Sequence, residues 1–209
     1  FLQLCAHENI QVMNCTTPAN YFHALRRQIH RDFRKPLIIM TPKSLLRNKR
    51  CVSNIEDFNR NNSFHRVLND HADLKEYGLI KLKKNKDIKK VVICSGKVYF
   101  DLIEAREKIK NDQVYMIRIE QLYTFPVKTL AKELKRFKKN AEFYWCQEEP
   151  QNMGAWNTAR NYIQWTLDYI KATNRKVNYI GRKPAASPAS GYLKKHLAQQ
   201  KEIIEKVLS

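Results

Sequence analysis

The segment Phe143–Trp156, FYWCQEEPQNMGAW, predicts the fold class of this chain. A run of strand-forming apolar residues ends in two carboxylates, a proline and a glycine, and a long amphipathic pattern follows. This order is typical of a buried strand in an open α/β sheet that meets its next helix at its carboxyl end. Ligands and partner surfaces gather at that edge, so we expect the functional edge of the sheet here.

Strand and helix patterns alternate around this segment. Continuous apolar runs favour buried strands, and amphipathic periods favour helices. The expected strands are Val91–Cys94, Val114–Leu122, Phe143–Gln147 and Val177–Ile180. The expected helices are Lys97–Lys110, Val127–Lys138, Ala155–Ala172 and Ala189–Leu208. Four strands, each followed by a helix, predict an α/β fold in which a mostly parallel sheet is covered on both faces, as a three-layer α/β/α domain.

The first fifty residues predict a further strand–helix–strand unit. Gln11–Cys15 has the pattern of a short strand, Thr17 caps a helix that begins at Pro18, and Lys35–Thr41 has the pattern of an apolar strand. We expect the apolar face of the helix to be core, and its residues are Tyr21, Phe22, Leu25 and Ile29. The opposite, basic face is either solvated or a contact for an anion or a subunit. It carries His23, Arg26, Arg27, His30 and Arg31.

Residues 51–90 have an irregular pattern with asparagine clusters and a lysine run. This predicts a connector longer than the usual loop, with a short helix near Phe64–Leu68. The expected divisions of the chain are therefore residues 1–50, 51–90 and 91–209. The opening FLQLCAHENI is typical of the end of a helix already under way, and the first residue is Phe1. We therefore expect the chain to be the C-terminal piece of a longer protein.

Thirty-nine Lys and Arg residues against 20 Asp and Glu give a formal net charge of +19. Such an excess is typical of proteins that bind polyanions. The lysines are dense only in Lys81–Lys90 and Lys132–Lys139, and they alternate with asparagines, as a drift in surface composition would produce. Because a charge run is usually a solvated face and interleaved aromatics are sparse, we expect no nucleic-acid partner. A free-standing basic nucleic-acid-binding module stays the alternative of a different class.

Membrane and redox features are equally plain. No apolar run approaches the roughly 20 residues that span a bilayer, so we expect no membrane partner. The five cysteines show neither paired spacing nor a CxxC motif, which fits a reducing compartment. They are Cys5, Cys15, Cys51, Cys94 and Cys146.

Two sites at strand ends could carry chemistry. Ser95-Gly96-Lys97 opens a helix after the strand Val91–Cys94, where free N–H groups could hold an anion, although Ser95 as a helix cap is favoured. Glu148 and Glu149 are adjacent in a strand and point to opposite faces, so a salt bridge or a subunit contact is favoured over acid–base catalysis.

A third segment, Gly181–Gly191, is rich in small residues and proline. We expect it to make close contact between domains or subunits, with Ser187 capping a helix that begins at Pro188. HExxH and GxSxG motifs are absent from the sequence, and the glycine pattern falls short of a P-loop. The residues therefore predict no complete active site.

Five segments, taken in order along the chain, have the sequences that are most specific for a protein family. They are FLQLCAHENIQVMNCTTPANYFHALRRQIHRDFRKPLIIMTPKSLLRNK (1–49), VVICSGKVYFDL (91–102), IRIEQLYTFP (117–126), WCQEEPQNMGAW (145–156) and GRKPAASPASGYLKKH (181–196). Together they closely resemble the C-terminal part of the thiamine diphosphate-dependent decarboxylating component of 2-oxoglutarate dehydrogenase. The resemblance implies that residues 1–50 end the pyrimidine-binding domain and that residues 91–209 form a transketolase-like C-terminal domain.

The resemblance also implies an activity for the whole protein. Such enzymes use thiamine diphosphate and Mg²⁺ to decarboxylate 2-oxoglutarate, and they succinylate the lipoyl group of the succinyltransferase component in the tricarboxylic acid cycle. The family binds the cofactor at a GDG…N segment of an earlier domain, and no GDG occurs here. It implies that this chain alone binds no cofactor or metal, is inactive and holds no catalytic residue. A 2-oxoadipate dehydrogenase shares the layout and stays open.

The family further implies partners and control. It forms obligate homodimers, located in the cytoplasm of bacteria or the mitochondrial matrix of eukaryotes, and its C-terminal domain supports the dimer. Some relatives bind acetyl-CoA as an effector between the last two domains. The corresponding residues here are Gln11, Arg27, Ser63, Arg66, Gln121 and Lys128. Arg27 on the basic helix face and Lys128 near a helix start are reasonable partners for phosphate.

Overall fold

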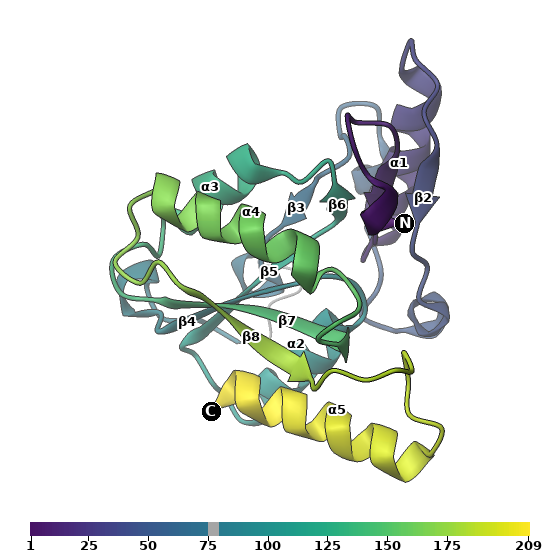
Figure 1. The fold of residues 1–209 in the computed structure, drawn as a ribbon. Coiled ribbons are helices and arrows are strands. Elements are labelled where there is room, and N and C mark those ends of the chain that lie inside the picture. Colours follow the sequence, from purple (N-terminus) through teal and green to yellow (C-terminus); the bar gives the residue numbers. More distant parts are fainter. Residues whose placement is uncertain (75–79) are drawn as a thin grey trace.

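Two sheets organise the computed structural model, which describes residues 1–74 and 80–209 (Figure 1). The larger sheet has the order β3-β5-β4-β7-β8. Its strands are β3 (Val67–Leu68), β4 (Lys90–Cys94), β5 (Val114–Ile119), β7 (Glu142–Pro150) and β8 (Val177–Arg182). The short edge strand β3 is antiparallel to β5, and the other pairs are parallel. The mostly parallel sheet predicted from the sequence is confirmed.

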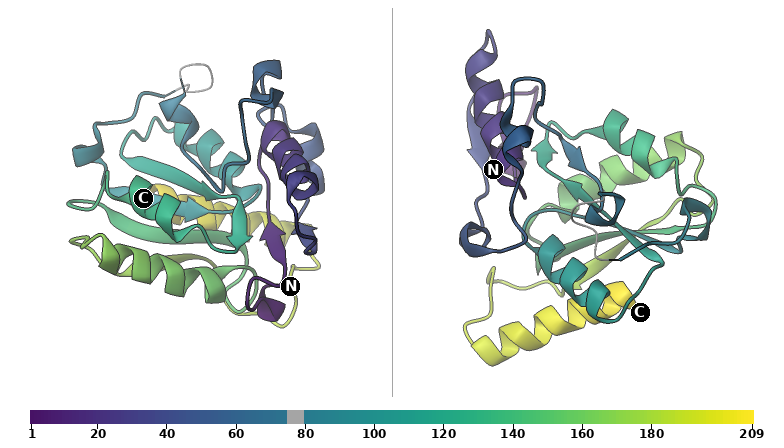
Figure 2. Two further views of the ribbon diagram at one scale, coloured as in Figure 1. Left: turned by 90° about the horizontal axis from the view of Figure 1, so that it is seen from above. Right: turned by 180° about the vertical axis from the view of Figure 1, so that it is seen from behind.

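Helices cover both faces of this sheet (Figures 1 and 2). The helices α3 (Val127–Leu134) and α4 (Trp156–Tyr169) lie on one face, and α2 (Val98–Lys108) and α5 (Leu193–Leu208) lie on the other. Successive strand residues point to opposite faces, so Ile93 joins the core under α3 and α4 while Val92 joins the core over α2 and α5. The predicted three-layer arrangement is confirmed. No helix of the described residues combines the length and apolar composition that crossing a bilayer requires.

A smaller sheet joins the first part of the chain to the last. Its order is β2 (Leu37–Ile39), β1 (Gln11–Met13) and β6 (Gln121–Tyr123), with β1 parallel to β2 and antiparallel to β6. The sequence predicted one strand over Val114–Leu122, but the chain leaves the larger sheet after β5 and enters the smaller one as β6. Two segments more than 100 residues apart in sequence are therefore paired.

The helix α1 (Pro18–His30) begins as predicted, with the Thr17 hydroxyl accepting a hydrogen bond from the Asn20 N–H. The prediction that its apolar face is core is wrong for this structure, because Phe22, Leu25 and Ile29 are 42%, 45% and 73% exposed. The buried residues are Ala19, Asn20, His23 and Ala24. Polar contacts decide the orientation: the Asn20 side chain exchanges two hydrogen bonds with the backbone of His65.

Local predictions failed in the connector and at the first residues. The short helix expected near Phe64–Leu68 is replaced by the strand β3. Elsewhere in its described residues the connector forms 3₁₀ turns, at Ile55–Phe58, His71–Asp73 and Asn85–Asp87. A further 3₁₀ turn, Lys43–Arg47, precedes the connector. The opening residues form a 3₁₀ turn, Leu2–Leu4, and not the end of an α-helix. The predicted divisions at residues 50 and 90 stay predictions.

The last helix starts later than predicted. Ser187 donates to the carbonyl of Ala189 and does not cap a helix, and α5 begins at Leu193 with no side-chain cap. The remaining predicted helices and strands are present with shifted ends.

A buried carboxylate fastens α1 to the link between β5 and β6. Glu120 is fully buried and accepts hydrogen bonds from the Thr16 N–H at 2.8 Å, the Thr16 hydroxyl at 2.5 Å and the Asn20 side-chain amide at 2.9 Å. Arg118 donates to the Thr16 hydroxyl oxygen and lies over the Tyr99 ring. Burial raises the pKa of the Glu120 carboxyl, against the lowering influence of Arg118 and of the hydrogen bonds.

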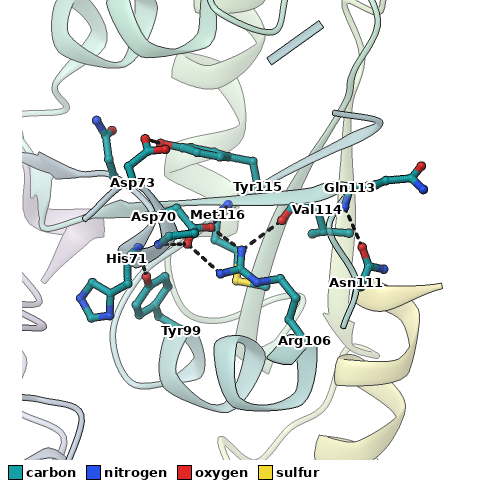
Figure 3. A network of polar contacts seen from close by, with 12 residues as sticks. Asp70, His71, Asp73, Tyr99, Arg106, Asn111, Gln113, Val114, Tyr115 and Met116 are labelled. Atoms are coloured by element: carbon teal, nitrogen blue, oxygen red, sulfur yellow. Dashed lines mark hydrogen bonds and ion pairs between the residues drawn. The ribbon is translucent and has the colours of Figure 1, made fainter. Parts of the chain in front are cut away.

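A second buried charge pair ties the connector to the larger sheet (Figure 3). Both nitrogens at the end of Arg106 donate to Asp70, at 2.5 and 2.8 Å, and both side chains are buried. The carboxylate also accepts from the N–H groups of Met116 and Ala72, and Arg106 donates to the carbonyl of Val114. Both carboxylate oxygens of Asp70 and both terminal nitrogens of Arg106 have partners, whereas Arg106 Nε has none among the described residues. The pair therefore fixes the connector against α2 and β5.

Loss of one member of this pair should destabilise the fold strongly. Arg106→Met leaves the Asp70 carboxylate buried without its cation, which should lower the free energy of unfolding by about 3–5 kcal/mol. Adding Asp70→Asn to Arg106→Met should cost less than the sum of the two single changes. Urea unfolding followed by circular dichroism measures all three variants.

Lys108→Met on the same helix is the matched control, because Lys108 pairs with Glu104 at the exposed surface. It should cost less than about 1 kcal/mol. Additive single and double changes at Asp70 and Arg106 would show that the pair does not act as a unit.

The Glu120 carboxyl predicts a pH dependence. Its folded pKa lies above its ordinary value of 4.5, so the folded state binds the proton more tightly than the unfolded state does. Its stabilising contribution is therefore fully present below pH 4.5 and is lost as pH rises through the folded pKa. Relative to Glu120→Gln, the wild-type protein should lose about 1.4 kcal/mol per pH unit within that window.

Urea unfolding of both proteins across this pH range tests the prediction, since other groups contribute equally to the two curves. A wild-type advantage that grows with pH would mean that the hydrogen bonds outweigh burial at Glu120.

Candidate functional site

A basic hollow lies between α1 and the segment that leads into β3. It has a volume of about 580 Å³, and Thr129 at the start of α3 also lines it. Among the described residues that line it, six carry basic side chains and none is acidic. The basic residues are His23, Arg26, Arg27, His30, His65 and Arg66. A hollow with this lining favours an anionic ligand.

Arg27 is held in the hollow by side chains of the smaller sheet and by an aromatic ring. Its guanidinium donates to the side-chain oxygens of Gln121 at 2.7 Å and Gln11 at 3.2 Å, and it lies 4.2 Å from the centre of the Phe64 ring. Burial, followed by the neighbouring charges of Arg31 and Arg66, lowers the pKa of Arg27 to about 10. The neighbouring cations repel one another, and an anion between them would relieve that repulsion.

Glutamines set the position of this guanidinium. Gln121 lies in β6, and its amide donates to the Thr124 carbonyl at 2.7 Å, which leaves its oxygen facing Arg27. Gln11 lies in β1 and also accepts from Arg31 at 2.7 Å. The small sheet thus brings two glutamines from distant parts of the chain to one arginine.

His23 and Arg26 have a structural role in the hollow. The Asp57 carbonyl can only accept and the Arg26 guanidinium can only donate, so His23 donates from Nε2 to Asp57 and accepts at Nδ1 from Arg26. Arg26 also donates to the carbonyls of Arg60 and Asn62. These contacts hold the wall of the hollow, whereas Arg66 is exposed at its rim.

A second hollow of about 520 Å³ adjoins the first and shares His23, Ser63 and Thr129 with it. It extends to Arg118 and His71 beside the larger sheet. Burial, with Arg118 as the next cause, lowers the pKa of His71 to about 3, so this imidazole is neutral near pH 7. Together the two hollows form an elongated depression with its densest positive charge at α1.

The structure brings five of the six predicted effector residues together. Gln11, Arg27 and Gln121 are joined by hydrogen bonds, while Ser63 and Arg66 line the hollow beside Arg27. Lys128 is exposed and lies outside the lining, although its neighbour Thr129 belongs to it. The basic residues His23, Arg26 and His30 were visible in the helical spacing. His65 and Thr129 carried no signal in the sequence.

The Ser95-Gly96-Lys97 segment does not cap a helix as favoured from the sequence. The Ser95 hydroxyl donates to the Ile119 carbonyl, and α2 has no side-chain cap. Gly96 has φ of +76°, and a Cβ there would lie 2.4 Å from the side-chain nitrogen of Asn14. This glycine permits close approach of the two sheets.

Lys97 is engaged by two carboxylates, Glu148 and Asp101. The expected structural salt bridge of Glu148 is therefore confirmed, and the ammonium that could have held an anion is already neutralised. Burial is the first cause that raises the pKa of Glu148, against the lowering influence of Lys97.

Comparison with known families gives two matches that follow one another along the chain. The family model described as transketolase, pyrimidine binding domain, matches residues 1–49, and the model described as 2-oxoglutarate dehydrogenase C-terminal matches residues 52–208. A solved structure titled split gene transketolase, inactive beta4 tetramer, has a TM-score of 0.54 at 10% sequence identity. That match covers 95% of this chain and 56% of the solved chain, and it supports the transketolase-like fold.

Curated relatives agree with the family models. The 2-oxoglutarate dehydrogenase E1 components of Brucella ovis, Brucella canis and Brucella suis are each 56% identical to this chain over 208 residues. The alignments cover 100% of this chain, which spans only 21% of the length of these relatives. The chain belongs to the 2-oxoglutarate dehydrogenase E1 family, whose C-terminal part it matches.

Proposed function

We propose that the chain acts as the C-terminal part of an enzyme that decarboxylates 2-oxoglutarate and transfers the succinyl group to the lipoyl group of a succinyltransferase component. The observation that carries this proposal is the 56% identity to E1 components along the whole chain. The order of the two family matches along the chain supports it.

Thiamine diphosphate with Mg²⁺ would supply the carbanion chemistry of this reaction. Within residues 1–74 and 80–209, no three His, Cys, Asp or Glu side chains are grouped so that they could hold a metal ion. We assign no step through the cofactor to the described residues. We propose that this part of the chain, by itself, neither binds the cofactor nor turns over substrate.

The chain would contribute architecture instead. Glu120 and the pairing of β6 with β1 hold the smaller sheet against the three-layer domain. These contacts would fix the end of the pyrimidine-binding domain in place. We further propose that the whole enzyme is a homodimer and that the three-layer domain supports the contact between subunits, together with α1. The exposed apolar residues Phe22, Leu25 and Ile29 of α1 are surface available for such contacts.

We propose the basic hollow as the site of an acyl-CoA effector. Arg27 and Arg66 would pair with the phosphate groups, since guanidinium forks suit phosphate oxygens. The elongated depression formed by the two hollows would accommodate a long ligand. A bound effector would then regulate the enzyme from the region where the smaller sheet meets the larger one.

The proposed reaction is tested with the complete polypeptide that carries this chain. Supplied with thiamine diphosphate, Mg²⁺ and ferricyanide as electron acceptor, it should oxidise 2-oxoglutarate. In a separate assay, with an oxidised lipoyl domain in place of ferricyanide, it should give a succinylated product visible by mass spectrometry. Preference for 2-oxoadipate would move the protein to the related 2-oxoadipate enzymes. Inactivity with both 2-oxo acids would contradict the proposal.

The effector site is tested by titrating the same protein with acetyl-CoA in a calorimeter. Arg66→Gln should weaken binding about tenfold, because a charged hydrogen bond to phosphate is lost while the exposed side chain carries no part of the core. Arg47→Gln, which removes an exposed arginine outside the hollow, is the matched control and should leave the affinity unchanged. Absence of acetyl-CoA binding to the wild-type protein would rule out this effector.

A further inference from the structure

The two lysine-rich runs of the sequence meet in space. The Asn140 side chain donates to the Lys86 carbonyl at 2.5 Å, and Arg136 donates to the Asn85 side chain at 3.4 Å. The N–H of Glu142 donates to the Lys89 carbonyl at 2.8 Å. Lys81–Lys90 and the end of the run Lys132–Lys139 therefore form one surface, although about 50 residues separate them in the sequence.

A third basic segment joins them. The N–H of Thr173 donates to the Lys138 carbonyl, and the Asn174 side chain donates to the Ala141 carbonyl. This brings Lys171, Arg175 and Lys176 beside the second run. We call the surface formed by residues 81–90, 135–139 and 171–176 the basic face, which lies where β4, β7 and β8 begin, at the left of the molecule in Figure 1.

The basic face is rich in unneutralised charge. Arg136 is engaged by Asp73 and Glu133, and Lys83 approaches Asp112 at 3.7 Å. Among the residues that the structure describes, the other exposed lysines of this face form no ion pair. They are Lys81, Lys84, Lys86, Lys89, Lys135, Lys139, Lys171 and Lys176. Like charges held this close repel, and an anionic partner would relieve the repulsion.

The surface is also hollowed. An open depression of about 780 Å³ is lined by Lys81, Lys83, Lys84, Lys86 and Lys89, with Gln113 and Asn140 as polar neighbours and Asp87 as the acidic lining residue. A depression receives a protruding chain segment more readily than a planar bilayer. None of the large apolar residues exposed on the described surface belongs to the basic face, so it offers nothing to insert into a membrane.

Nucleic acid fits less well than protein. Base stacking needs presented aromatic rings. Tyr115 and Phe137, the rings beneath this face, are buried and covered by Arg136. The exposed stacked pair Trp165 and Tyr169 belongs to α4, outside the basic face. The exposed lysines are flexible point charges and suit dispersed carboxylates. We propose that the basic face binds an acidic protein segment, carrying several Asp or Glu residues, through its lysines.

This site is separate from the effector hollow. Thr129, near the first residue of α3, lines the hollow, whereas Lys135 and Lys139 follow the end of that helix on the basic face. The proposal therefore depends on neither the reaction nor the effector.

The test uses a fluorescein-labelled oligoglutamate peptide and measures its anisotropy with the complete protein at low and high salt. The peptide should bind at low salt and be released at high salt, as screening predicts. The combined variant Lys84→Glu, Lys86→Glu, Lys135→Glu and Lys139→Glu should bind about tenfold more weakly, because four favourable rim charges are reversed.

The combined variant Lys43→Glu, Lys49→Glu, Lys194→Glu and Lys195→Glu is the matched control. It changes the net charge equally at exposed lysines outside the basic face, and it should retain the wild-type affinity. Urea unfolding checks that both variants fold. Equal losses in the two variants, no peptide binding at low salt, or preferential binding of single-stranded RNA or phosphatidylglycerol vesicles at the basic face would each overturn the proposal.

Discussion

The hydrogen bonds of one buried carboxylate hold this structure in register. Glu120 sits where the chain leaves the larger sheet, and it gathers the residues that precede and begin α1. Gln121, the next residue, faces Arg27 from the strand that pairs with β1. The position of the basic hollow therefore depends on the contacts that Glu120 makes between β5 and β6. Three donors and Arg118 offset only part of the cost of burying this carboxylate, since the pKa of Glu120 stays above its ordinary value.

The larger sheet was predictable because its strands are nearly continuous apolar runs separated by amphipathic helices. The mostly parallel pairing and the helices on both faces follow from that pattern, whereas the strand order and the edge strand β3 come from the structure. The predictions that failed concern features that depend on partners distant in the sequence. The run through Glu120 has the pattern of one strand, and only pairing with β1 separates β6 from β5. The orientation of α1 is set by the pair of hydrogen bonds between the Asn20 side chain and the His65 backbone, which hydrophobic periodicity cannot detect.

The candidate sites show the same limit. The spacing of histidines and arginines in α1 predicted a basic helix face. His65 and Thr129 lie beside that face only because of the tertiary fold. Lysine density along the sequence understated the surface charge, because Lys86, Lys139 and Lys171 belong to segments that adjoin only after folding. Composition alone suggested a drift spread over the whole surface. The fold concentrates part of that excess at one end of the parallel strands.

Gly96, just after β4, lies against Asn14, just after β1, and the Asn14 amide occupies the space that a side chain would need. The separation of the two sheets at this point is therefore dictated by a missing methyl group. Alanine would displace the Asn14 side chain and would also face an unfavourable backbone angle. A larger residue here therefore has to be matched by a change at Asn14, so one position after β4 constrains one position after β1.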